Sequence, residues 1–359
     1  MIILSLISNK MISPFRTLIL FSFSFSFLTV TSLNAQRHLP AIEILTSGTK
    51  TSLRGLSVVN DNVVWVSGSN GTVGKTTNAG KNWKWITVKG FEKKEFRDIE
   101  AFDAATAVII AVDSPGYILK TNDGGESWKV VYENKTKGIF LDAMEFWNEQ
   151  SGIIIGDPID GRFFILRTFD GGSTWRDIPL ANRPVANSGE ACFAASGTNI
   201  RALDRDEAVF VSGGAKSRIF IRDAAIELPI IQGKETTGAN SISVFDHNKR
   251  KGGKRMIVVG GDFNADSSTT KNCFLSSDHG KSWWAPKIPP HGYRSCVEYY
   301  LSKKNILACG PNGVDYTFDG GKSFTLISGE GFHVCRVAKY GGSIFLAGGN
   351  GKVGRVAWE

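Results

Sequence analysis

The chain has 359 residues, with 42 lysines and arginines against 34 aspartates and glutamates, which gives a formal net charge of +8. That length allows two ordinary domains or one large all-β array, and a mild, scattered positive charge argues against a nucleic-acid partner. The five cysteines fit no zinc-binding spacing, and since no other metal or redox motif is visible we expect no cofactor. Their positions are Cys192, Cys273, Cys296, Cys309 and Cys335.

The first 35 residues differ in kind from the rest of the chain. They contain Lys10 and Arg16 but no acidic residue, then an apolar run over 21–27, then small and polar residues up to Ala35. This profile predicts a signal peptide that is cleaved near Ala35. A start at Met11 would give a leader of more usual length.

Two interpretations of this leader remain open. The apolar run could be a membrane anchor, but it is short for a membrane span. We therefore expect residues 1–35 to be removed, which leaves a secreted or periplasmic protein, residues 36–359, with no transmembrane segment.

An eight-residue pattern, Ser/Thr-x-Asp-x-Gly-x-Ser/Thr-aromatic, recurs along the rest of the chain. Its copies are 121–128, 168–175, 276–283 and 317–324, with a weaker copy at 76–83. An aspartate accepts hydrogen bonds from the N–H groups that follow it, and glycine supplies the positive φ that a tight turn needs. The aromatic residue then opens the next strand. We therefore interpret the aspartates as structural hairpin corners and not as catalytic groups. They are Asp123, Asp170, Asp278 and Asp319.

This pattern resembles the Asp-box, or BNR, repeat of sialidase-like β-propellers, and the resemblance covers most of the chain after residue 40. The longer repeats are most similar to exported BNR propellers related to photosystem II assembly and stability factors. The resemblance implies a propeller fold. It leaves the function open, because both enzymes and binding proteins carry this repeat.

The copies recur about every 45 residues, a period that with four strands per repeat is typical of propeller blades. The interval between Trp175 and Trp283 has room for two repeats, one of which lacks the box. We expect seven blades. Their first strands are predicted to start at Leu53, at Phe96, at Phe140, near Gly189, near Asn240, at Tyr293 and at Phe332.

The last repeat has only three strands of its own. Segment 41–48 matches the fourth-strand segment 324–329, so we expect the N-terminal strand to close the last blade. Closure matters because an open sheet edge is a site of aggregation. The predicted fold is all-β, a monomeric seven-bladed β-propeller.

Strand direction defines two faces of such a ring. The first strand of each blade runs from face A to face B, the hairpin between strands two and three returns to face A, and the Asp-containing turns lie on face B. Face A collects the starts of the inner strands, and propeller ligands usually bind where inner strands converge. We therefore predict a binding mouth at face A, with a basic arc facing an acidic arc. Its residues are Arg54, Arg97, Asp98, Asp142, Asp157, Glu190, Arg294 and His333.

Two functions fit this mouth. In the first, the protein is a non-enzymatic binding module whose arginines pair with carboxylates of a protein or another anionic ligand. The resemblance to assembly factors, which dock client proteins, implies this function. The same charges also have a purely structural interpretation, in which arginines and acidic residues near the axis neutralise one another.

The second function is a sialidase-like glycoside hydrolase acting on a glycan. The resemblance to sialidases implies that three arginines bind the substrate carboxylate and that a tyrosine, paired with a glutamate, acts as the nucleophile. The residues that could serve are Arg54, Arg97, Arg294, Tyr293, Tyr299 and Glu298, and a carboxylate pair among Asp98, Asp142, Asp157 and Glu190 could serve other glycosides. Asp98 departs from the sialidase Phe-Arg-Ile-Pro signature because it stands where isoleucine belongs.

Three cysteines share one column of the predicted first strands. Cys192, Cys296 and Cys335 occupy the position that apolar residues hold in the other blades. Such a column is inter-blade core, so we expect buried, inert thiols. A disulfide between Cys296 and Cys335 is the alternative.

Overall fold

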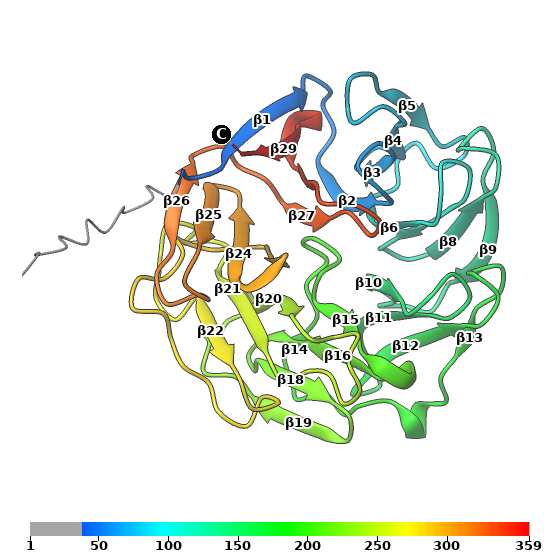
Figure 1. Cartoon of the computed structure of the whole chain (residues 1–359). Helices are drawn as coiled ribbons and strands as arrows, with labels where there is room; N and C mark the ends of the chain where they lie inside the picture. Colours follow the sequence, from blue (N-terminus) through cyan, green and yellow to red (C-terminus); the bar gives the residue numbers. More distant parts are fainter. Residues whose placement is uncertain (1–37, 359) are drawn as a thin grey trace, which may run out of the picture. The chain divides into compact units, whose positions relative to one another are not determined.

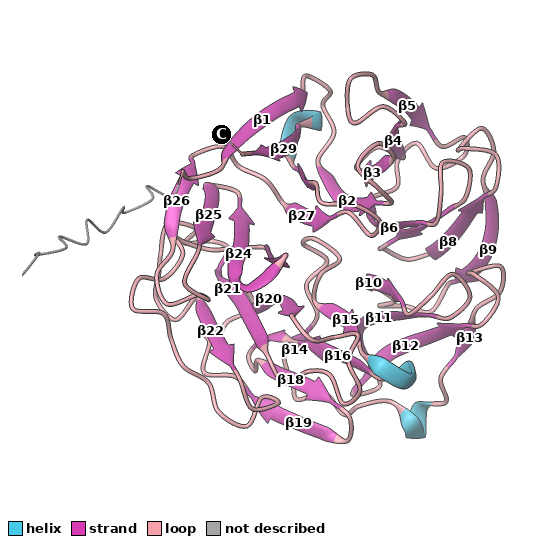
Figure 2. Ribbon diagram, in the orientation of Figure 1, coloured by secondary structure: helices cyan, strands magenta, loops and turns pink. Residues whose placement is uncertain are grey.

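The computed structural model describes residues 38–358. The predicted signal peptide, its cleavage site and the alternative start at Met11 lie outside the described residues. Within residues 38–358 the chain forms seven antiparallel sheets, arranged as blades around a central axis (Figure 1, Figure 2). This confirms the predicted all-β, seven-bladed β-propeller. No helix in this range has the length and apolar composition needed to cross a membrane.

The first three blades are four-stranded meanders in which the innermost strand comes first in the chain. Blade one consists of β2 (Leu53–Val58), β3 (Val64–Gly68), β4 (Thr72–Thr76) and β5 (Lys84–Thr87). Blade two consists of β6 (Phe96–Ala101), β7 (Ala107–Ala111), β8 (Gly116–Thr121) and β9 (Lys129–Asn134). Blade three consists of β10 (Leu141–Phe146), β11 (Gly152–Ile159), β12 (Arg162–Thr168) and β13 (Arg176–Asp177), followed by the 3-10 helix η1 (Leu180–Asn182).

Blades four and five are the irregular part of the ring. Blade four consists of β15 (Ile200–Ala202), η2 (Asp204–Asp206), β16 (Ala208–Val211), β18 (Arg218–Ile221) and β19 (Ala224–Glu227). Blade five consists of β20 (Thr237–Val244), β21 (Met256–Asp262) and β22 (Cys273–Ser276), extended by the short strands β14 (Glu190–Ala191) and β17 (Gly213–Gly214).

The predicted start of blade four near Gly189 is therefore wrong. The first strand of this blade is β15, and Glu190 lies instead in β14, which pairs with β17 beside blade five. The reason is that residues 192–199, between β14 and β15, form no strand of a blade. They contact blades one and six instead. No local turn signal marks this segment, because blade four carries no Asp-containing corner.

Blades six and seven close the ring. Blade six consists of β23 (Cys296–Tyr300), β24 (Ser302–Gly310), β25 (Gly313–Thr317) and β26 (Thr325–Ser328). Blade seven consists of β27 (Val334–Val337), β28 (Ile344–Ala347), η3 (Gly349–Gly351) and β29 (Val353–Ala357), and β1 (Ala41–Thr46) is its outermost strand. β1 pairs antiparallel with β29, from Ala41 opposite Ala357 to Thr46 opposite Val353, as the sequence match predicted.

The repeated aspartates lie in the turns between the third and fourth strands. In the turn after β8, the Thr121 hydroxyl donates to Asp123 Oδ1 at 2.8 Å, and the same oxygen accepts the N–H of Ser127 at 3.0 Å. The Gly125 N–H donates to the Thr121 hydroxyl at 3.0 Å, with φ of +86° at this glycine. The same carboxylate contacts recur at the other three corners, around Asp170, Asp278 and Asp319. All these bonds are local, so each corner forms without help from the rest of the ring.

The segment between β14 and β15, residues 192–199, reaches residues of blades one, two, six and seven, and we call it the plug. It is buried from Ala194 onward, with Thr198 and Asn199 fully inaccessible. The plug contacts the other blades near the starts of their inner strands: the Ala195 carbonyl accepts from Arg54 of blade one at 3.2 Å, and the Ser196 hydroxyl donates to the Ser295 carbonyl of blade six at 2.7 Å. The plug therefore fills the channel on the side of face A.

Candidate functional site

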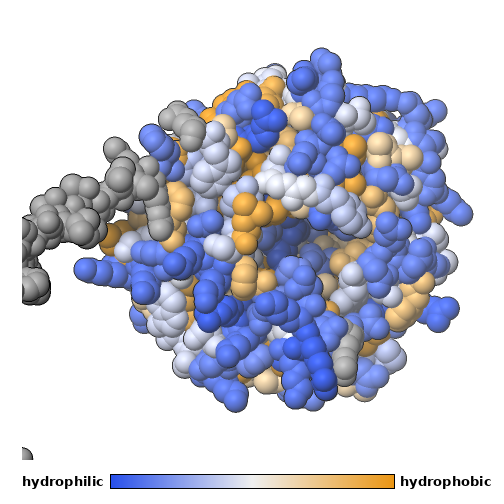
Figure 3. Space-filling model, in the orientation of Figure 1, coloured by the Kyte–Doolittle hydropathy of each residue, from blue (hydrophilic) through white to orange (hydrophobic). Residues whose placement is uncertain are grey.

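The main hollow of the described residues opens on face B. It is a cavity of about 1030 Å³ lined by residues from the C-terminal ends of all seven inner strands, for example Ser57 of β2 and Glu298 of β23. Figure 3 shows it as a depression with a hydrophilic floor near the centre of the face. Its size is at the upper end of the range for small-molecule pockets. We call this hollow the face B pocket.

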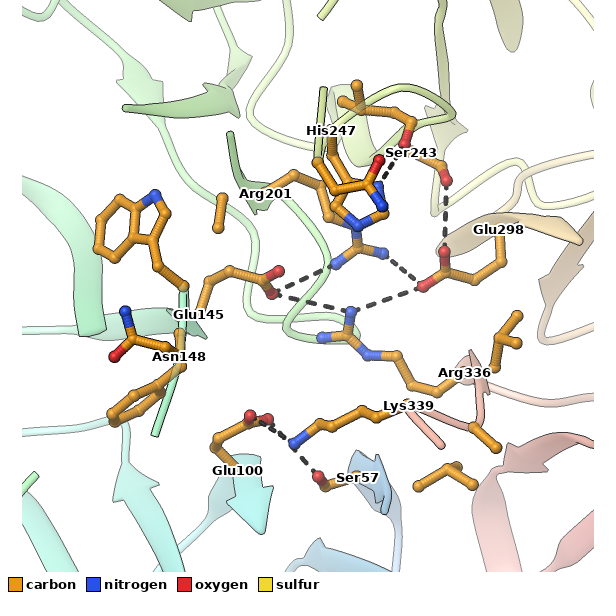
Figure 4. A pocket seen from close by; sticks show the side chains of 18 of the residues that line it. Ser57, Glu100, Glu145, Asn148, Arg201, Ser243, His247, Glu298, Arg336 and Lys339 are labelled. Carbon is orange, nitrogen blue, oxygen red and sulfur yellow. Dashed lines mark hydrogen bonds and ion pairs between the residues drawn. The ribbon is translucent and has the colours of Figure 1, made fainter. Parts of the chain in front are cut away.

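Two arginines and two glutamates form the floor of the pocket (Figure 4). Arg201 Nη2 lies 2.5 Å from Glu298 Oε1, and Arg201 Nη1 lies 3.7 Å from Glu145 Oε2. Arg336 Nη1 lies 3.5 Å from the same oxygen of Glu298 and 4.0 Å from Glu145. Each carboxylate thus faces both guanidinium groups. Burial raises the pKa of Glu298, whereas the neighbouring carboxylates raise the pKa of Arg336 even though burial opposes this.

The walls of the pocket are net acidic and partly aromatic. Lys339 pairs with Glu100 at 2.5 Å on the side of blade two. In all, six acidic side chains, three lysine or arginine side chains and His247 line the pocket, so its formal charge is −3 with the histidine counted as neutral. The charged side chains are Glu100, Glu145, Glu149, Asp204, Asp206 and Glu298, against Arg201, Arg336 and Lys339. At the rim, Leu301 is 75% exposed and Tyr340 is 68% exposed, so apolar surface faces solvent beside the charged floor.

The predicted basic arc at face A is present in part. Arg54, Arg97 and His333 lie close enough for mutual repulsion: burial and then the two arginines lower the pKa of His333 to about 3, and burial and Arg97 lower the pKa of Arg54. His333 Nε2 is 3.2 Å from the Ser52 hydroxyl. Because the Arg54 guanidinium donates to the plug, part of this charge is used to hold the plug.

The predicted acidic residues Asp98, Asp142 and Asp157 lie beside the plug. Asp98 is buried and its carboxylate accepts from the N–H groups of Ile99 and Met144 at 2.9 and 2.8 Å. Asp142 is fully buried and neither oxygen has a well-formed hydrogen bond; burial and the adjacent Asp157 carboxylate raise its pKa well above the usual value. Burial also raises the pKa of Asp157 to about 6.

Gly197 of the plug packs directly on Asp98. A methyl group at Gly197 would lie 2.3 Å from the carboxyl carbon of Asp98, and the glycine has φ of +64°. The Gly197 carbonyl also accepts from Arg336 at 2.9 Å. The plug therefore separates the acidic residues of face A from the face B pocket and touches both.

Asp98 should make the stability of the protein depend on pH. Burial raises the pKa of Asp98 to about 8, whereas an aspartate in an unfolded chain has a pKa near 3.9. Between these values the folded protein holds a proton that the unfolded chain releases, so stability falls as pH rises. The contribution is at most about 1.4 kcal/mol per pH unit. We expect Asp98→Asn to remove the contribution of Asp98 to this slope.

The measurement is the free energy of unfolding in urea from pH 4 to pH 9 for the wild type and Asp98→Asn. The free energy of unfolding of the variant, relative to that of the wild type, should increase steadily up to about pH 8 and then level off. Asp103→Asn is the matched control, because the Asp103 carboxylate is exposed and caps a turn. Parallel curves for the wild type and Asp98→Asn would contradict the prediction.

Two predicted mouth residues are engaged elsewhere. Arg294 is fully buried, and its Nη2 lies 2.5 Å from buried Asp315. The guanidinium also donates to Asn312 and to the carbonyls of Tyr293 and His291. Glu190 accepts from Arg218 at 2.5 Å and from the Ser212 hydroxyl at 2.5 Å. Burial acts to raise the pKa of Glu190, but these hydrogen bonds outweigh it and lower the pKa. Both side chains are therefore engaged in ion pairs with residues outside the predicted mouth, Arg294 with Asp315 and Glu190 with Arg218.

The residues considered for glycoside hydrolysis are divided between the two faces. Glu298 and Tyr299 line the face B pocket, whereas Tyr293 is buried and its hydroxyl donates to Asn240 at 2.8 Å. Asp98, Asp142 and Asp157 are absent from the pocket lining.

Four central residues of the pocket were not among the predicted site residues: Glu145, Arg201, Arg336 and Lys339. They lie at or near the C-terminal ends of inner strands, whereas the predicted mouth at face A was built from the starts of these strands. The sequence does carry a signal for these residues, because they are charged residues near the C-terminal ends of strands that are otherwise apolar.

The fold and the site together define a seven-bladed β-propeller whose inner strands end at a charged pocket on face B. No family model matches the sequence, and no curated protein matches it. Among solved structures, the chain is similar to YCF48 bound to a D1 peptide, with 16% identity and a TM-score of 0.60 over 90% of this chain and 100% of that one.

Two further solved structures are similar. YCF48 from Cyanidioschyzon merolae has 14% identity and a TM-score of 0.63, over 88% of this chain and 99% of that one. The WD40 domain of Neurospora crassa Pan2 has 9% identity and a TM-score of 0.59, over 87% and 89%. At these identities the similarity concerns the fold, and it agrees with the seven-bladed β-propeller.

Proposed function

We propose that this protein is a non-enzymatic binding module that receives a positively charged segment of a partner protein in the face B pocket. The observation that carries the proposal is the pocket itself, a hollow of about 1030 Å³ with a net formal charge of −3 beside an exposed apolar rim. Cationic side chains on a peptide would meet carboxylates in the pocket and aromatic faces at its rim.

The comparisons support a protein partner by analogy of fold. One similar propeller is a YCF48 bound to a D1 peptide. We also propose that the chain belongs among the Asp-box, or BNR, propellers, because its four aspartate corners share one hydrogen-bond pattern. Binding of an anionic ligand at the face A mouth stays a prediction, and the plug makes the pocket on face B the favoured site.

The experiment compares three labelled peptides of equal length and aromatic content that carry lysine, glutamine or glutamate at matched positions. We expect fluorescence polarisation to show the tightest binding for the lysine peptide. Glu149 is an exposed acidic residue of the pocket rim, so Glu149→Lys should weaken binding about 3- to 10-fold, which is the effect of about 1 kcal/mol.

Glu235→Lys is the matched control, because Glu235 is exposed and precedes β20 on the side of face A. It should leave the affinity unchanged. Tighter binding of the glutamate peptide, lost in Arg54→Ala, would overturn the proposal in favour of the face A mouth.

We propose in addition that the protein is exported. The proposal is supported by the basic, then apolar, then small-residue order of residues 1–35. Sequencing the N-terminus of the protein recovered from its native host should give a mature chain that starts at Gln36. An intact Met1 or Met11 would contradict it.

A further inference from the structure

Three of the five cysteines meet between blades six and seven. They are Cys296 of β23, Cys309 of β24 and Cys335 of β27, all fully buried. Their three sulfur atoms all lie within 4.8 Å of one another. The fold brings them together because Cys296 and Cys309 are direct partners across two strands, and Cys335 occupies the neighbouring inner strand.

The spacing of the sulfur atoms fits shared coordination of one ion. A metal that binds thiolates at about 2.3 Å holds three sulfurs of a trigonal site roughly 4 Å apart. Cys335 Sγ lies 3.6 Å from Cys296 Sγ, and the third sulfur lies within the same 4.8 Å limit. The cysteines are free thiols, and small side-chain rotations would bring all three sulfurs to the trigonal distance.

The surroundings supply partners for sulfur but no fourth metal ligand. The Cys335 N–H donates to Cys296 Sγ at 3.3 Å, and the Thr198 hydroxyl of the plug lies 3.6 Å from the same sulfur. The Arg336 guanidinium interacts electrostatically with Cys296, which offsets part of the charge of bound thiolate. Among residues 38–358, no histidine or carboxylate joins this group of three sulfurs.

We propose that Cys296, Cys309 and Cys335 form a three-thiolate site for one soft monovalent cation, copper(I) or its analogue silver(I). Soft thiolate ligands select copper(I), whereas structural zinc takes four ligands in a tetrahedron. Binding releases the thiol protons that the sulfurs carry and involves no electron transfer. The site joins the inner strands of blades six and seven, so an occupied site ties the two blades together beside the plug.

The test uses the full chain, reduced and kept under argon, with silver(I) as the probe and copper(I) in competition with bathocuproine as the second probe. Each ion is added to the folded protein and, in a parallel arm, during refolding, so that a buried site is reached in either case. We expect one ion per chain, a higher Tm because the ion binds the folded state, and an X-ray absorption spectrum of copper with three sulfurs at about 2.3 Å.

Variants separate the site from other thiols. Cys296→Ala and the bulkier Cys296→Val should both bind no ion, with circular dichroism and Tm confirming that at least one of them folds. The double variant Cys192→Ala/Cys273→Ala should still bind one ion, because those two buried thiols lie outside the group of three. Binding of no ion in both arms, an unchanged stoichiometry in the Cys296 variants, or a protein that is two hydrogen atoms lighter through a Cys296–Cys335 or Cys296–Cys309 disulfide would overturn the proposal.

Discussion

Deletion of β1 (Ala41–Thr46) is expected to abolish cooperative folding of the ring. This strand is the outermost strand of blade seven and has five residues in register with β29. Ile42 and Leu45 pack against the apolar cluster shared by blades one, six and seven. Losing five paired residues at about 1 kcal/mol each, together with the partial burial of two apolar side chains at roughly 1 kcal/mol each, removes roughly 7 kcal/mol. That is comparable with the whole stability of many domains.

The measurement is urea unfolding followed by near-ultraviolet circular dichroism and by light scattering. The deletion exposes the free edge of β29, so we expect association at micromolar concentration as well as a lost transition. Glu43→Ala is the matched control within the same strand. Glu43 and Arg355 form a half-exposed pair at 2.7 Å, so this variant should lose less than about 1 kcal/mol. A deletion variant that unfolds cooperatively near the wild-type midpoint would show that β1 is dispensable.

The features that could be predicted from the sequence are those with local causes. Each Asp-containing corner is built from a carboxylate, a hydroxyl and a glycine within eight residues, so its pattern is visible in the sequence wherever it occurs. The match between segments 41–48 and 324–329 predicted the closing strand, because both segments occupy the same position of a blade.

The features that could not be predicted depend on contacts between distant segments. The plug has no turn signature, and it is held by groups from other blades such as Arg54 and Ser295. Since the plug fills the channel near face A, it decides which end of the ring stays open. The floor of the face B pocket likewise joins Glu145, Arg201 and Glu298 from three different blades, and no spacing in the sequence connects them.

The position of Arg294 shows why a charge near the start of an inner strand is an ambiguous signal. Its column in the sequence also holds Arg54 and Arg97, so a shared role at the mouth was the natural interpretation. Arg54 and Arg97 remain half-buried, whereas Arg294 is fully buried. The difference arises from Asp315 of β25, a buried carboxylate that pairs with Arg294.

Arg294→Ala is therefore expected to destabilise the fold by about 3 to 5 kcal/mol, because removing one partner of a buried ion pair leaves the other charge uncompensated. Asp315 would keep only His291, whose Nδ1 lies 2.6 Å from it. Arg294→Lys should lose less, since it keeps the charge but not the fork of nitrogens that now reaches Asp315, Asn312 and the His291 carbonyl.

The double variant Arg294→Ala/Asp315→Ala completes a thermodynamic cycle and should be less destabilised than the sum of the two single variants. Arg355→Ala, at the half-exposed pair with Glu43, is the surface control and should lose less than about 1 kcal/mol. Urea unfolding of the four proteins of the cycle, which are the wild type, Arg294→Ala, Asp315→Ala and the double variant, gives the free energies. Peptide binding to the folded Arg294→Ala protein is the second measurement. If Arg294 is structural, stability falls and the affinity of the folded fraction stays the same. A loss of affinity with unchanged stability would show instead that Arg294 takes part in binding at face A.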